Sequence, residues 1–328
     1  MKIRDTDYLY ATMRVRANEK SLLNSSQISR MVSAKTPEEA AKILSEAGYS
    51  DVSLNSLSDI FAAVTKMQAE AYELVGEVLD NAFLRDVFLL KYDFHNIKVA
   101  VKARLTGEDP TRLMSDFSII PKDELLNAVR TGDMSALPEK MSEAIKLSEE
   151  KLSHTGNAQM ADFVLDAACF DMMRDAAIKS GSEFLVGYVK LMCDVANLRT
   201  AVRVRRQKSE LGVLKSAFVP GGETDAETLY ADDLKEVFFG TLLQPAASLA
   251  DAVIDGKSGF TEFERELDSA LVYYMQSAKY VAFDERPIVA YLAAKETEAQ
   301  AVRIIMAGKF ENLSPDQIQS RLRGIKNG

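Results

Sequence analysis

One stretch of twelve residues occurs three times in this chain, and this internal repeat constrains the fold more than any other feature. Each copy begins with an acidic residue, has an aliphatic residue four positions later and a cation five positions later, and ends on a second cation. The copies are 101 and 104 residues apart, and they run from Asp93 to Arg104, from Asp194 to Arg205 and from Glu298 to Lys309. Three long blocks of this kind predict three related structural units and argue against a solenoid of many short repeats.

The match between the copies extends beyond these twelve residues. Pro110 and Pro315 keep the same spacing as the copies. Two further sets of apolar residues also fall in register, namely Leu113, Leu214 and Ile318, and Phe117, Phe218 and Leu322. We therefore divide the chain into helical repeats at residues 1–117, 118–222 and 223–328.

Each copy has the apolar spacing of an amphipathic helix. Phe94, Ile97 and Val101 lie at positions i, i+3 and i+7, and the second copy repeats this spacing. We interpret the acid and the final cation as an N-terminal carboxylate and a C-terminal cation that match the helix dipole. A functional acid–base pair is the alternative interpretation.

The rest of the chain favours the same secondary structure. Helical periodicity is found almost throughout, strand-type alternation is hard to find, and Gly (16) and Pro (8) are both scarce. Helix starts are marked at Thr36-Pro37 and Ser314-Pro315, where a capping hydroxyl precedes a proline. The sequence predicts an all-α fold.

Composition excludes several classes of function. A net charge of −9 argues against a general nucleic-acid binder, which needs a basic face. No apolar run approaches the roughly 20 residues of a membrane span, and the N-terminus does not resemble a signal peptide. Two cysteines, Cys169 and Cys193, fit a reducing compartment, and we expect them to be core thiols. If the protein serves a membrane, we expect it to do so from outside the bilayer.

Signals for catalysis, metals and cofactors are weak. Gly256-Lys257-Ser258 resembles the end of a phosphate-binding loop, but Asp251 stands where that motif needs its first glycine, so we expect no nucleotide site. The two histidines, His95 and His154, have no metal-ligand spacing, and no Cys-x-x-Cys occurs. We expect no metal, no cofactor and no catalytic residue, although an enzyme acting through carboxylates stays open as an alternative.

The densest group of charges is basic and lies at the end of the second copy. Arg199, Arg203 and Arg206 share one helix face at positions i, i+4 and i+7. A solvated face is the simplest interpretation. Our hypothesis is that these three arginines form a contact surface for an acidic partner.

The two ends of the chain resemble a known family. Residues 287–298, Val302 to Ile305, Gly308-Lys309 and Leu313-Ser314-Pro315 are similar to the C-terminus of the C subunit of bacterial and archaeal V-type (A-type) ATPases, whose eukaryotic counterpart is the d subunit. Tyr8, Tyr10, Arg14-Val15-Arg16, Leu22-Leu23 and Tyr49 resemble the start of that family. One departure is Ala301, which stands where the other copies have Asn96 and Asn197 and where the family commonly keeps Asn, so a polar contact there is open.

The resemblance implies a specific architecture and role. It implies a funnel of three similar helical domains around a pseudo-threefold axis, seated on the cytoplasmic face of the membrane as a peripheral protein. The funnel would rest on the proteolipid rotor ring and receive the D and F subunits of the central stalk. It would have no catalytic site and would transmit torque for proton or sodium ion transport. The alternative is a free-standing helical scaffold that binds other partners.

Overall fold

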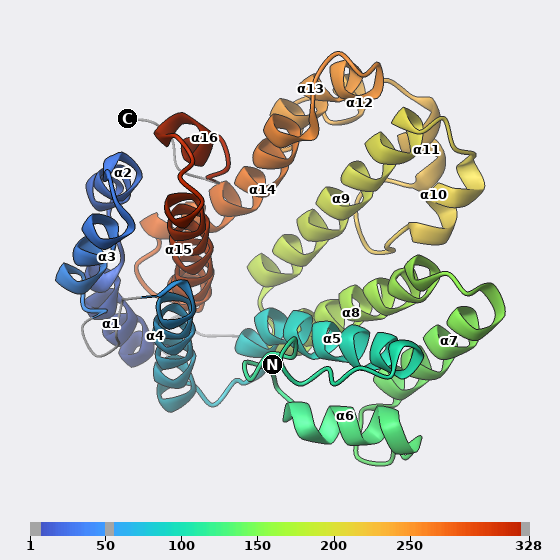
Figure 1. Ribbon diagram of the computed structural model, residues 1–328, viewed down its shortest axis with the longest axis horizontal. Coiled ribbons are helices and arrows are strands. Elements are labelled where there is room, and N and C mark those ends of the chain that lie inside the picture. The colour runs from blue at the N-terminus through green and yellow to red at the C-terminus, as the bar shows by residue number, and fades with distance from the viewer. Residues whose placement is uncertain (1–7, 50–55, 323–328) are drawn as a thin grey trace. The chain divides into compact units, whose positions relative to one another are not determined.

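The computed structural model describes residues 8–49 and 56–322, and within these ranges all regular structure is helical (Figure 1). The prediction of an all-α protein is therefore confirmed. The chain forms two compact units. The first unit joins both ends of the sequence, Met1–Asp80 and Leu234–Gly328, and the second unit is Asn81–Asp233. The division into three sequence blocks stays a prediction.

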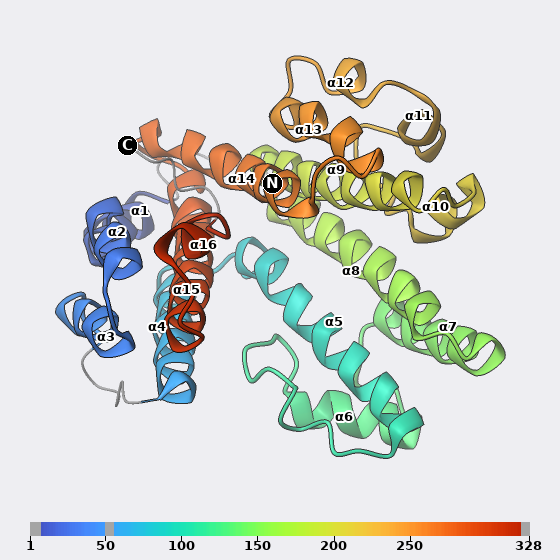
Figure 2. The same cartoon turned by 45° about the horizontal axis from the view of Figure 1, so that its top comes forward.

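The second unit is built on three long helices. Helices α5 and α8 lie side by side, α7 packs along α8, α6 packs against α5, and α10 and α11 pack against α9 (Figures 1 and 2). Its elements are α5 (Phe83–Thr106), α6 (Lys122–Thr131), α7 (Glu139–Thr155), α8 (Ala158–Ser180), α9 (Glu183–Arg206), α10 (Leu211–Ala217) and α11 (Ala226–Ala231).

The first unit is organised around its last long helix, α15. Helices α4 and α14 pack against α15, and so do α1, α2 and α3 from the start of the chain. Its elements are α1 (Leu9–Asn18), η1 (Glu19–Ser21), α2 (Ser25–Ser33), α3 (Pro37–Glu46), α4 (Leu57–Val78), α12 (Leu234–Val237), α13 (Gln244–Ile254), α14 (Phe260–Gln276), η2 (Ser277–Tyr280), α15 (Arg286–Phe310) and α16 (Pro315–Gln319).

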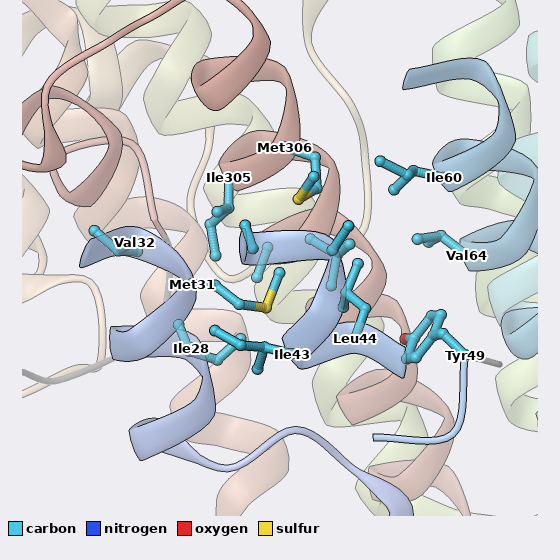
Figure 3. Packing of buried hydrophobic residues seen from close by; sticks show 14 of the residues in the cluster. Ile28, Met31, Val32, Ile43, Leu44, Tyr49, Ile60, Val64, Ile305 and Met306 are labelled. Carbon is cyan, nitrogen blue, oxygen red and sulfur yellow. The ribbon is translucent and has the colours of Figure 1, made fainter. Parts of the chain in front are cut away.

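The two ends of the chain share one hydrophobic core in this unit (Figure 3). Met31 of α2 and Leu44 of α3 are fully buried together with Ile60 of α4 and with Ile305 and Met306 of α15. Each such side chain contributes about 1.5–3 kcal/mol when it leaves water. The N-terminal helices are therefore bound to α15 by apolar burial.

The marked helix starts are confirmed. The Thr36 hydroxyl accepts a hydrogen bond from the Glu39 amide, and Pro37 takes the first position of α3. Ser314 and Gln317 form a reciprocal capping box at α16, and Asn24 and Gln27 form another at α2. These caps satisfy amides that the first turn of a helix leaves unpaired.

The interpretation of the repeated acid as an N-terminal carboxylate is wrong. Asp93, Asp194 and Glu298 lie near the middle of α5, α9 and α15, because each helix begins ten or more residues before the acid. All three acids are buried. The final cations do lie in the last helical turns, as predicted. Helix dipoles act only within the first and last turns, so these acids need other partners.

Candidate functional site

The predicted basic face lies on the C-terminal half of α9. Arg203 is exposed there, whereas Arg199 and Arg206 are half-buried on the same side of the helix. Arg205 belongs to the same sequence cluster but has a structural role, because its guanidinium donates to the carbonyls of Leu229 and Asp232. Arg205 therefore helps to hold α11, and the contact surface of Arg199, Arg203 and Arg206 stays a prediction.

The first two repeated acids bind loop amides. The Asp93 carboxylate accepts hydrogen bonds from the amides of Ile119 (3.2 Å) and Ile120 (2.9 Å), just before α6. The Asp194 carboxylate accepts from the amide of Glu223 (3.0 Å) and from the amide and hydroxyl of Thr224 (3.3 and 3.0 Å), just before α11. Each acid therefore holds the chain where a short helix is about to begin.

The turn at Gly221-Gly222 lies directly against the Asp194 carboxylate. A Cβ atom on Gly222 would lie 2.2 Å from Oδ1 of Asp194, which is far inside van der Waals contact. Gly221 adopts a φ of 113°, a value that side chains other than glycine rarely adopt. The two glycines allow the backbone to pass directly over the buried carboxylate.

An asparagine three residues after the acid makes a second contact. Asn96 donates from Nδ2 to the carbonyl of Ser115 (2.9 Å) and accepts from the amide of Ser115 (2.7 Å). Asn197 makes the same pair of bonds with Val219, at 2.8 and 2.9 Å. Both amides are buried, and together they fix the loop in the same way in two copies.

The final cation of each copy holds the far end of the short helix. Arg104 donates to the carbonyl of Val129 in α6, at 3.2 Å. Arg205 donates to the carbonyl of Asp232, just after α11, at 3.1 Å. Cations at this end of a helix satisfy its last carbonyls and its negative dipole. We call the acid and cation together a clamp: one long helix holds a short helix at its beginning and its end.

The third clamp is built from distant parts of the sequence. The Glu298 carboxylate accepts from the amide of Leu23 (2.5 Å), just before α2. The Lys309 ammonium donates to the carbonyls of Val32 (2.5 Å) and Ala34 (2.7 Å), at the end of α2. Helix α15 thus holds a helix from the start of the chain as α5 holds α6 and α9 holds α11. The N-terminal helix completes the third copy of the device.

The third clamp contains two polar groups that join no other clamp. Lys295 is 3% exposed, and its ammonium donates to Glu298 at 2.9 Å. The Tyr49 hydroxyl donates to the same carboxylate oxygen at 2.9 Å. Ala301 stands where the other copies have asparagine, so it cannot make the asparagine contact. A buried salt bridge and a tyrosine are therefore added in the copy that lacks the asparagine.

Burial changes the acid–base properties of these clamps. It raises the pKa of Asp93 to about 6, although hydrogen bonds from the amides of Ile120 and Ile119 act in the opposite direction. It also raises the pKa of Asp194. Burial, with the charge of Glu298 beside it, raises the pKa of Tyr49 far above the ordinary value. The Tyr49 phenol is therefore a permanent donor to Glu298 at physiological pH.

Sequence reasoning named the repeated acids and cations but included Lys295 only in the family resemblance and gave it no role. A signal for it was present, since Lys295 occupies the register position at which the first two copies carry Leu90 and Leu191. A lysine at a core position of a repeat predicts a buried partner. Tyr49 was noted only through the family resemblance.

The remaining candidates have structural roles. Gly256 has a φ of 74° after α13, and the amides of Lys257 and Ser258 donate to the carbonyl of Ala252, so these amides terminate a helix. His95 is exposed, and its Nε2 donates to the Leu113 carbonyl.

Cys169 and Cys193 are buried as predicted, and burial raises the pKa of both thiols to about 12. Neutral thiols of this kind are poor nucleophiles.

Residues 8–49 and 56–322 contain no group of three or more His, Cys, Asp or Glu side chains placed to hold a metal ion. In the same ranges, none of the helices combines the length and the apolar character needed to cross a bilayer. The clamps supply hydrogen bonds that fix short helices to long ones.

The comparisons with known proteins all point to the same family. The sequence profile of the ATP synthase (C/AC39) subunit family matches residues 11–321. The C subunit of the V-type sodium ATPase of Enterococcus hirae is 22% identical over 316 residues, which cover 95% of this chain and 96% of the relative. The C subunit of the A-type ATP synthase of Haloferax volcanii is 24% identical, and the match covers 95% of this chain and 96% of the relative. The C subunit of the A-type ATP synthase of Thermococcus kodakarensis is 25% identical, and the match covers 96% of this chain and 90% of the relative.

Proposed function

The chain belongs to the ATP synthase (C/AC39) subunit family, a family of non-catalytic subunits of rotary ATPases, and we propose from this that it links the central stalk to the membrane rotor ring. In this proposal it turns with the rotor and transmits torque for proton or sodium ion transport. The observation that carries the proposal is the family match over residues 11–321, which leaves almost no part of the chain for another activity.

The clamps support the mechanical part of this proposal. A torque-transmitting body must keep its helices fixed when force is applied at its ends. Buried charged hydrogen bonds hold their geometry because breaking one leaves an uncompensated charge in a low-dielectric interior. Three long helices, α5, α9 and α15, each fix a short helix in this way. We propose that the function of the repeated acids and cations is to make the protein rigid.

We further propose the threefold arrangement that the family resemblance implied, with three helical repeats around a funnel axis. Its support is the third clamp, in which helix α2, near the start of the chain, supplies the short helix of the last copy. A chain whose last repeat is completed by a helix from its first repeat is suited to a closed ring of repeats. Under this proposal the repeat boundaries at residues 117 and 222 stand, and α2 packs with the third repeat.

The proposed partners are the D and F subunits of the central stalk on one side and the proteolipid ring on the other, at the cytoplasmic face of the membrane. The relatives are named as subunits of a V-type sodium ATPase and of A-type ATP synthases. The test is affinity purification of the tagged chain from detergent-solubilised membranes. We expect stalk subunits and a proteolipid ring to co-purify. A chain recovered alone from the soluble fraction would contradict the proposal and favour a free-standing scaffold.

We propose that Arg199, Arg203 and Arg206 contact an acidic surface of the stalk or the ring. Reversing two charges in Arg203→Glu/Arg206→Glu should then weaken co-purification of one partner at least tenfold at low salt. The matched control is Lys146→Glu/Lys151→Glu, which changes the net charge equally at two exposed positions of α7. Equal partner binding by the two double variants would show that the basic face is only a solvated surface.

A further inference from the structure

The three long helices of the repeat end in the same backbone conformation. A residue just beyond the end of each helix keeps the spacing of the repeat, and its φ is 70° at Gly107, 55° at Lys208 and 58° at Asn312. Such values belong to the left-handed region, which glycine enters freely and asparagine tolerates. The fold therefore uses this conformation at three equivalent positions, and only the second copy fills its position with a residue type that disfavours it.

Neighbouring groups fix the backbone at Lys208. The amide of Lys208 donates to the carbonyl of Arg205 (3.1 Å), and the amide of Ser209 donates to the carbonyl of Val204 (3.0 Å). The hydroxyl of Tyr230, in α11, donates to the carbonyl of Ser209 at 3.1 Å. These bonds involve the main chain of the turn and not the lysine side chain. The fold thus accounts for the conformation but not for the choice of lysine.

Contacts within the protein do not explain the lysine either. Lys208 is exposed, and its ammonium forms no ion pair with a residue in the ranges 8–49 and 56–322. The helix dipole does not supply the reason, because three arginines already lie in the last turn of α9. A left-handed conformation is unfavourable for a residue with a Cβ atom, and such strain is concentrated at functional sites. A lysine is therefore kept where the fold alone favours glycine or asparagine.

Charge is the property that lysine adds here. The end of α9 gathers Arg203, Arg206 and Lys208 within six residues. We propose that Lys208 pairs with a carboxylate of the protein partner that the basic face of α9 is proposed to bind. The inference rests on the proposed function, which supplies that partner.

A lipid headgroup is a poorer match for this end of α9. Lipid-facing sites place aromatic rings beside their cations, so that the rings enter the headgroup layer. Residues 199–217 carry a single exposed large apolar side chain, that of Val213, and it is not aromatic. Cations without such rings suit ion pairs across a protein interface.

Lys208→Gly tests the proposal because its effects on stability and on binding should have opposite signs. Glycine relieves the strained backbone, so the unfolding temperature should rise by about 2–4 °C. Loss of the ammonium should lower, by about threefold at low salt, the amount of stalk or ring subunits that co-purifies with the tagged full chain from detergent-solubilised membranes. A lower unfolding temperature would show that the lysine serves the helix end, and the proposal would fail.

Three matched variants separate strain from charge. Asn312→Gly relieves the same conformation in the other unit and removes no cation, so it should stabilise the protein slightly and leave co-purification unchanged. Lys208→Arg keeps both the cation and the strain, and it should behave like the wild type. Lys146→Gln removes an exposed cation of α7 and should change neither property. Equal loss of partner in Lys146→Gln and Lys208→Gly would show that only net charge matters.

The outcomes separate this proposal from the proposed function. Recovery of the wild type without stalk or ring subunits would overturn both. Equal recovery of these subunits with the wild type and with Lys208→Gly would overturn this proposal alone. Vesicles of phosphatidylcholine and phosphatidylglycerol test the lipid alternative. If Lys208→Gly binds these vesicles about tenfold less than the wild type but keeps the rotor subunits, the lysine serves a membrane and the proposal is wrong.

Discussion

The clamps of α5 and α9 differ from the clamp of α15 in how far along the chain their partners lie. In the first two, the acid and the cation hold a short helix that follows within a few tens of residues, and an asparagine fixes the loop between them. In the third, Glu298 reaches the amide of Leu23, 275 residues away, and no asparagine is present. The same chemistry serves a local contact in one unit and a contact between chain ends in the other.

This difference gives a physical reason for the Tyr49 contact of the third clamp. A local loop is already near its helix, and the hydrogen bonds of the acid and the asparagine fix it. The N-terminal helix must instead be brought back over most of the chain, at a larger cost in loop entropy. Tyr49, which follows α3, adds a charged hydrogen bond to Glu298, and the shared core of α2, α3, α4 and α15 adds apolar burial (Figure 3). Lys295 lies in α15 itself and compensates the charge of Glu298 there.

The largest expected effect comes from removing the centre of the third clamp. Glu298→Ala should destabilise the first unit by about 3–5 kcal/mol, because Lys295 is left as an uncompensated buried charge. Thermal unfolding followed by circular dichroism measures the loss, and hydrogen exchange at the amides of α2 should accelerate. A double variant, Lys295→Met/Glu298→Leu, should recover part of the stability. A cost no larger in Glu298→Ala than in that double variant would show that the charge pair is not what matters.

The first clamp should respond to pH. Because the pKa of Asp93 is about 6 in the folded state and about 3.9 when unfolded, the native state holds an extra proton between these values. Its contribution to stability is fully present below about pH 4 and is lost as the pH rises through 6, by up to about 3 kcal/mol.

Denaturant unfolding of the wild type and of Asp93→Asn at pH 4, 5, 6 and 7 tests this expectation. The variant should lose the part of the pH dependence that Asp93 supplies. Parallel pH profiles for the two proteins would mean that Asp93 titrates at an ordinary pKa.

We expect an asparagine at this position to stabilise the clamps of α5 and α9 but not the clamp of α15. Asn96→Ala and Asn197→Ala each remove two hydrogen bonds of a buried side chain and leave a loop amide unsatisfied, so each should cost about 2–3 kcal/mol. Ala301→Asn places a polar group in the core of the first unit, and we expect that it does not stabilise that unit. Stabilisation by Ala301→Asn, measured by thermal unfolding, would show that the third loop retains the same binding site.

The smallest expected effect is at the end of α2. Lys309→Met keeps the apolar length of the side chain but removes its two hydrogen bonds to backbone carbonyls, for an expected loss of about 1–2 kcal/mol. Hydrogen exchange should rise in the last turn of α2 before it rises in α4. Uniform exchange changes across the unit would argue against a local clamp.

The sequence predicted much of this fold because helices are encoded locally. The apolar spacing of Phe94, Ile97 and Val101 identifies the buried side of α5, and Thr36-Pro37 marks the start of α3. It failed at Asp93, whose helix begins at Phe83, because helical periodicity does not mark where a helix starts when no capping residue is present. The basic face at Arg203 stays a prediction, since charge spacing shows only which side chains share a face.

By itself the sequence determined the helices, their repeated register and the family, since each depends on residues close together in the chain or on similarity along it. Only the tertiary structure decided what the repeated acids and cations do. Spacing alone could not reveal that Glu298 meets Leu23, or that Lys309 meets Val32, because these contacts arise only when the two ends of the chain pack into one core.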